Sequence, residues 1–91
     1  MSVTVRIPTI LRTYTGGESQ VDAEGETLSA VIDSLDGSYP GIKARVVDEQ
    51  GALRRFVNIY VGNDDVRFSD GLDTATPDGT QVSVIPAVAG G

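Results

Sequence analysis

Hydrophobic and polar residues alternate near the beginning of the chain. Residues 3–7 (VTVRI) place hydrophobic side chains at every second position, and this period of two predicts a half-buried strand that Pro8 ends. Residues 15–18 (TGGE) have turn chemistry, and residues 19–25 (SQVDAEG) are interpreted as a short second strand antiparallel to the first. The chain is therefore expected to open with a hairpin.

The hydrophobic period changes after Gly25. Four hydrophobic residues then recur at i, i+3, i+4 and i+7, which predicts one stripe of an amphipathic helix. These residues are Leu28, Val31, Ile32 and Leu35. Thr27 is expected to be the N-cap and Gly37 the C-cap, and Pro40 disfavours continuation of the helix. Residues 42–51 are expected to hold one short helical turn and then a loop.

The clearest strand pattern lies in the second half of the chain. Residues 56–61 (FVNIYV) place branched side chains on one face and Phe56, Asn58 and Tyr60 on the other. Residues 62–65 (GNDD) predict a turn, and residues 66–68 (VRF) a short return strand.

Residues 80–86 (TQVSVIP) predict the last strand, with Val82 and Val84 on one face and Ile85 on the other. The predicted order is two strands, a helix, a loop and three strands, the middle one short. This order favours an α+β domain of the β-grasp type, as in ubiquitin, with about five strands in a mixed sheet around one main helix. In that arrangement the first and last strands are parallel neighbours in the sheet centre, where branched side chains are common.

The amino-acid composition and net charge limit the range of possible functions. The chain has 91 residues, enough for one domain, and contains neither Cys nor His. Thiol nucleophiles, disulfides, histidine acid–base catalysis and the usual zinc sites are therefore excluded, and no bound metal is expected. The formal net charge of −6 argues against nucleic-acid binding and favours partners with basic surfaces, with the alternative that the charge serves only to keep the protein in solution. No apolar run suits a membrane span and the first ten residues do not resemble a secretory signal, so the expected location is the cytoplasm.

The sequence resembles the bacterial ubiquitin-like sulfur carriers. This family includes the small subunit of molybdopterin synthase and the thiamine sulfur carrier, and the resemblance is greatest to the actinobacterial carriers of cysteine biosynthesis. Four segments support it, together with the predicted fold. They are VTVRIPTILR, FVNIYV, DVRFSDGL and the terminal VIPAVAGG.

The resemblance implies that the reactive group is the carboxylate of Gly91. An E1-like enzyme would adenylate it with ATP, and sulfur would then replace AMP to give a thiocarboxylate. Gly90 and Gly91 have no side chains to obstruct a narrow channel. The chain would then be a co-substrate and not an enzyme, with no cofactor of its own. Its partners would be the E1-like enzyme, a sulfur-accepting synthase and a metalloprotease that regenerates the Gly-Gly end. Cysteine biosynthesis is the first choice of pathway, and sulfur donation to the synthesis of thiamine, thio-containing natural products or other compounds is the alternative.

Docking is expected to involve the sheet face opposite the core, through Phe56, Tyr60 and Ile85. The tail itself would contribute Ala87, Val88 and Ala89. Residues 1–86 would form the domain and residues 87–91 a mobile tail on a monomer. An alternative for Phe56 is that the loop of residues 42–51 covers it.

Two other functions stay open at this point. The same activated terminus could be joined to a lysine of a target protein, as ubiquitin is. The chain could also be a non-catalytic β-grasp regulatory subunit whose Gly-Gly end is incidental.

Overall fold

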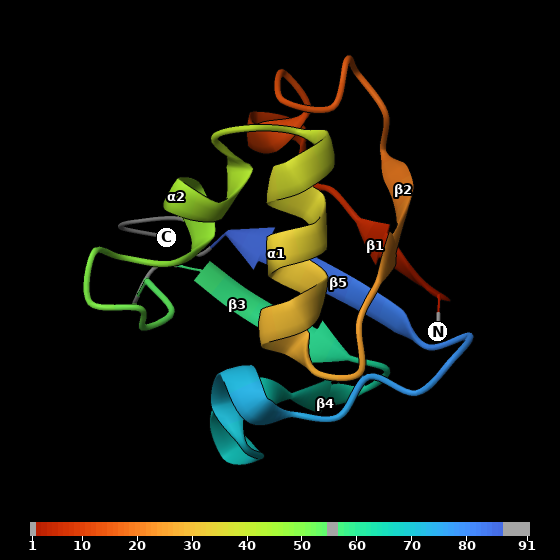
Figure 1. Ribbon diagram of the computed structural model, residues 1–91, viewed down its shortest axis with the longest axis vertical. Helices are drawn as coiled ribbons and strands as arrows, with labels where there is room; N and C mark the ends of the chain where they lie inside the picture. The colour runs from red at the N-terminus through yellow and green to blue at the C-terminus, as the bar shows by residue number, and fades with distance from the viewer. Residues whose placement is uncertain (1, 55–56, 87–91) are drawn as a thin grey trace.

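A five-stranded mixed sheet packs one face against a helix (Figure 1). The computed structural model describes residues 2–54 and 57–86. The strands are β1 (Ser2–Arg6), β2 (Gln20–Glu24), β3 (Val57–Val61), β4 (Asp64–Asp65) and β5 (Gln81–Pro86). They are ordered β2-β1-β5-β3-β4, with β1 and β5 parallel and the other neighbours antiparallel. The β-grasp prediction and the central pairing of first and last strands are confirmed.

The remaining elements connect and cover this sheet. The α-helices are α1 (Leu28–Ser38) and α2 (Ile42–Val46), and the short 3-10 helices are η1 (Thr9–Leu11), η2 (Val66–Phe68) and η3 (Gly71–Asp73). Figure 1 shows α1 lying across the sheet, with α2 near the end at which β5 points. Neither α-helix in the described part of the chain is long and apolar enough to cross a membrane.

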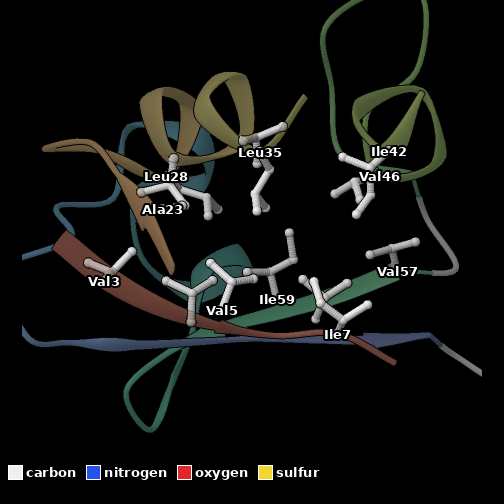
Figure 2. Packing of buried hydrophobic residues seen from close by; sticks show 14 of the residues in the cluster. Val3, Val5, Ile7, Ala23, Leu28, Leu35, Ile42, Val46, Val57 and Ile59 are labelled. Atoms are coloured by element: carbon white, nitrogen blue, oxygen red, sulfur yellow. The ribbon is translucent and has the colours of Figure 1, made fainter. Parts of the chain in front are cut away.

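The core lies between α1 and the inner face of the sheet (Figure 2). Val5 and Ile59 from the sheet and Leu28 and Val31 from α1 are almost completely buried. The predicted alternation is confirmed, because β1 and β3 bury every second side chain. Burial of each such side chain contributes about 1.5–3 kcal/mol.

The helix α1 begins as predicted and ends later than predicted. The Thr27 side chain accepts a hydrogen bond from the Ala30 amide at 3.3 Å and caps the N-terminus. Gly37 was wrongly predicted as the C-cap, since it lies inside the helix. The C-cap is Tyr39, whose amide donates to the Leu35 carbonyl at 2.7 Å. Beyond it, the Asp36 carboxylate accepts hydrogen bonds from the amides of Gly41, at 3.0 Å, and Lys43, at 3.2 Å. These bonds guide the chain from α1 into α2, which lies within the segment predicted to hold a short helical turn.

The second difference concerns residues 66–68, which form η2 and not the predicted return strand. The return strand is β4, which pairs with Tyr60 and Val61. The Asp65 carboxylate accepts a hydrogen bond from the Arg67 amide at 2.9 Å and turns the chain into η2. This turn buries Val66 and leaves Phe68 89% exposed.

Candidate functional site

The outer face of β5 is open near the point where residues 87–91 begin. Val82 and Val84 point to the core, whereas Ile85 is 46% exposed on the opposite face. Asn58 pairs with Ile85 and Tyr60 with Ser83, so Tyr60 and Ile85 share this outer face on neighbouring strands. The predicted placement of Tyr60 and Ile85 is confirmed, while their role in docking stays a prediction.

The other predicted site residues lie outside the described part of the chain. They are Phe56, Ala87, Val88, Ala89, Gly90 and Gly91. The fold nevertheless fixes where the tail starts. Pro86 is the last residue of β5 and pairs with Val57 at the beginning of β3.

A hollow of about 480 Å³ lies beside the C-terminal half of β5. Its lining includes Arg6 and Arg12, the apolar Pro8 and Ile10, and Ile85. It forms because β1 ends next to β5 and η1 then turns away from the sheet. The parallel pairing of the first and last strands therefore brings basic and apolar side chains to the start of the tail.

A second hollow, of about 310 Å³, adjoins the first through shared lining residues. Pro8, Ile10 and Val84 line both hollows, and Tyr14 and Arg45 line the second. Ile10 is 67% exposed and so forms an apolar ridge between them.

Two of the arginines at these hollows are held by neutral groups. Arg12 Nε donates to the carbonyl of Ile7 at 3.1 Å. Arg45 Nε donates to the Tyr14 hydroxyl at 2.7 Å, and its guanidinium carbon lies 5.9 Å from the centre of the Tyr14 ring. The bond with Tyr14 raises the pKa of Arg45 above its usual value, so this side chain is cationic at any physiological pH. Each guanidinium keeps further N–H donors for a partner.

The Arg67 side chain forms hydrogen bonds around the beginning of β3, the strand next to β5. Its guanidinium donates to Asn58 Oδ1 at 2.8 Å and to the carbonyls of Arg54, at 2.7 Å, and Val57, at 2.8 Å. One side chain from η2 therefore joins three points around the beginning of β3. Since Val57 pairs with Pro86, this network also supports the strand beside the start of the tail.

The site offers a binding surface and little chemistry of its own. Among the described residues, no three His, Cys, Asp or Glu side chains gather closely enough to hold a metal ion. The one ion pair within residues 2–54 and 57–86 joins Lys43 and Asp33, and it raises the pKa of Lys43. Both partners are exposed and on the helices, away from the outer face of the sheet.

Sequence reasoning missed Ile10 and the arginines around it. Ile10 belongs to no periodic segment, and Arg6, Arg12 and Arg45 lie in three separate parts of the chain. The available signal was a hydrophobic residue soon after a strand-ending proline and outside any periodic pattern.

Comparison with known proteins gives consistent matches over most or all of the chain. The sequence matches the ThiS family over residues 5–91. The Mycobacterium tuberculosis sulfur carrier protein CysO is 58% identical over 93 residues, and the alignment covers 100% of both chains. A chain of the crystal structure of the Amycolatopsis orientalis BexX/CysO complex has a TM-score of 0.92 and 54% identity, covering 98% of this chain and 99% of that one. Small archaeal modifier protein 3 of Haloferax volcanii is 40% identical over 65 residues, which cover 71% of this chain and 70% of that protein.

Proposed function

The chain belongs to the ThiS family, and on that premise we propose that it is a sulfur carrier whose reactive group is the carboxylate of Gly91. The observation that carries the proposal is full-length similarity to proteins named sulfur carriers, including the terminal residues. The fold supports it, because β5 leads from the sheet centre directly to residues 87–91.

The chemistry begins with activation of a poor electrophile. The negative charge of a carboxylate repels nucleophiles, and oxide is a very poor leaving group. In the proposed reaction an oxygen of the Gly91 carboxylate attacks the α-phosphorus of ATP and displaces pyrophosphate. A sulfide sulfur then attacks the acyl carbon of the adenylate, and AMP leaves with the bonding electrons. With a persulfide donor the same attack gives an acyl disulfide, from which a second thiol of the donor enzyme displaces the thiocarboxylate as it forms a disulfide. The product is a thiocarboxylate, and the absence of cysteine from the chain is compatible with this role.

The activating enzyme supplies the ATP site, and this chain supplies the sulfur-bearing end and the surface that is recognised. Gly90 and Gly91 let the end enter a narrow active site, because neither has a side chain. The thiocarboxylate is anionic at neutral pH and nucleophilic, as thiolates are. A sulfur-accepting synthase would use it, with cysteine biosynthesis as the first choice of pathway and the cytoplasm as its location. A metalloprotease could then release the product and regenerate Gly-Gly.

Docking would use the outer face of β5. Ile85 is exposed one residue before Pro86, and Tyr60 lies on the same face of the neighbouring strand. Large apolar side chains placed next to a reactive tail favour a partner interface over a solvated surface. A relative of the same fold is known in complex with a second protein, which supports action through docking. Phe56 and Ala87, Val88 and Ala89 remain further candidates for this interface.

Intact mass spectrometry tests the proposal. The chain is incubated with ATP, a sulfide source and the E1-like enzyme of the same organism. We expect a mass increase equal to the replacement of one oxygen by sulfur, and no increase after deletion of Gly91. Gly91→Ala should fold normally and be adenylated far more slowly, because a methyl group would obstruct the channel. An unchanged mass, with an enzyme that is active on another carrier, would contradict the sulfur-carrier function.

Protein modification is the second candidate function, and the similarity to a small archaeal modifier protein favours it. The same adenylate would then be attacked by a lysine amine of a target, with loss of AMP and formation of an amide. Expression of an affinity-tagged chain in its own organism should then give a ladder of conjugates on a gel. A chain that lacks Gly91 is the control, and a ladder that persists without Gly91 would exclude conjugation through this residue.

A further inference from the structure

Charged side chains from other elements are distributed unevenly between the two ends of β5. Four of the arginines that the structure describes have side chains near the end of β5 where the tail begins, whereas Arg54 lines a hollow with Asp36, Asp48 and Glu49. Arg6 and Arg12 share a hollow with Ile85, Arg45 shares one with Val84, and Arg67 bonds to Asn58 and to the Arg54 carbonyl. This concentration of positive charge contrasts with the net charge of −6.

Carboxylates surround the opposite end of β5. The Asp78 carboxylate accepts a hydrogen bond from the Ser2 amide at 2.8 Å, and Glu24 pairs with Ser2 in the sheet. Asp64 pairs with Val61, which itself pairs with Val82 near the start of β5. The surface around the two hollows, from which the tail departs, is therefore basic, and the opposite end of β5 is acidic.

Three of these arginines form what we call the arginine rim: Arg6, Arg12 and Arg45. They border the two hollows on either side of the Ile10 ridge. Within residues 2–54 and 57–86, none of them forms an ion pair with a carboxylate. Arg12 and Arg45 are already positioned by Ile7 and Tyr14, which lowers the entropy lost when a partner binds.

We propose that the arginine rim docks onto an acidic surface of the activating enzyme, with carboxylates around an apolar patch that contacts Ile10. This inference rests on the proposed function. The acidic character of the partner surface follows from charge complementarity, because guanidinium groups bind carboxylates in a planar, two-bond geometry and an exposed apolar side chain lies between them. The activating enzyme is the partner because, under the proposed function, it must hold the chain beside the tail during adenylation. The net charge alone suggested partners with basic surfaces, whereas the local charge beside the tail favours the opposite.

The experiment measures kcat/KM for adenylation by the E1-like enzyme of the same organism at low and high salt. The test variant is Arg6→Gln/Arg12→Gln, which removes two positive charges from the arginine rim. The control is Ser69→Asp/Gln81→Glu, which changes the net charge by the same amount through exposed residues away from it. Chemical unfolding of each variant establishes that it is folded before kinetics are measured.

We expect the test variant to lower kcat/KM about tenfold at low salt with little change in kcat, and the control to change it less than about twofold. The difference between wild type and the test variant should shrink as salt rises, because the Debye length falls from about 30 Å at 0.01 M to about 3 Å at 1 M. Ile10→Ser should raise KM at both salt concentrations, since its contact is apolar.

Several results would overturn the proposal. Equal losses in the test variant and the control would mean that only net charge matters. A kcat/KM unchanged in the test variant would show that the arginine rim is not at the interface, while the adenylation of wild type would leave the proposed function intact. An increase would indicate that the arginine rim holds the chain's own carboxyl terminus and not the partner. Failure to adenylate the wild-type chain, with the enzyme active on another carrier, would refute the proposed function itself.

Discussion

Gly25 shows how one residue permits the close approach of β2 and α1. A Cβ atom at this position would lie 2.6 Å from the Val31 amide nitrogen and 2.8 Å from both the carbonyl carbon and the Cβ of Ala30. These are contacts with the helix backbone and a short side chain, which no rotamer change can relieve. The absence of a side chain at Gly25 thus lets the chain pass directly against the first turn of α1.

We therefore expect Gly25→Ala to lower the free energy of unfolding by about 2–3 kcal/mol, because the helix must shift away from the sheet. Urea unfolding followed by circular dichroism measures the change. The matched control is Gly37→Ala, inside α1, where an added Cβ meets nothing within 4 Å. In this control the free energy of unfolding should increase by about 0.5–1 kcal/mol, since glycine weakens a helix interior. Equal effects of the two substitutions would contradict the steric explanation.

At the scale of elements, Arg67 connects η2 to the beginning of β3 through three acceptors. Lysine at this position keeps the charge but cannot reproduce the planar fork. We expect Arg67→Lys to lower the free energy of unfolding by about 1 kcal/mol and to speed hydrogen exchange of the β3 amides. Arg6→Lys is the control, because the Arg6 side chain forms no hydrogen bond with another described residue, and it should change stability by less than about 0.5 kcal/mol. Identical exchange in Arg67→Lys and wild type would show that the network does not hold β3.

The helices and strands show which structural features could be predicted from the sequence. Alternation identified β1, β3 and β5, because one face of each is buried, and the same alternation placed Tyr60 and Ile85 together on the outer face. The two errors arose where an aspartate bonds to nearby backbone amides. Asp36 bonds to the Gly41 and Lys43 amides just beyond the end of α1, and Asp65 bonds to the Arg67 amide at the start of η2. Neither set of bonds alters the hydrophobic period.

The arginine rim could not be predicted for a different reason. Its members come from β1, from the turn after η1 and from α2. Only the parallel pairing of β1 with β5 and the packing of α2 bring these segments together around Ile10. Such tertiary proximity depends on the complete fold, whereas alternation and helical period are local.

At the scale of the whole molecule, the folded body and the reactive end have separate tasks. The buried core of the described residues runs from Val3 to Val84, and β5 is hydrogen-bonded to a strand on each side. We expect a chain shortened after Pro86 to keep its free energy of unfolding within about 0.5 kcal/mol, because no residue of this core is removed. Urea unfolding of the shortened and complete chains gives the comparison.

The same shortened chain should lose sulfur loading completely, since the proposed reactive carboxylate is Gly91. A matched chain with Ala87, Val88 and Ala89 replaced by Ser keeps the length and both glycines, and so separates apolar packing from the loss of the reactive end. If shortening instead lowers stability by more than about 1 kcal/mol, and the Ser-substituted chain loses as much, the apolar part of residues 87–91 packs on the body. The two hollows beside Ile10 would be the surfaces to examine, because Val84 lines both of them and Ile85 lines the first. Stability without the tail, combined with loss of loading, would establish that the domain folds independently of the end that carries sulfur.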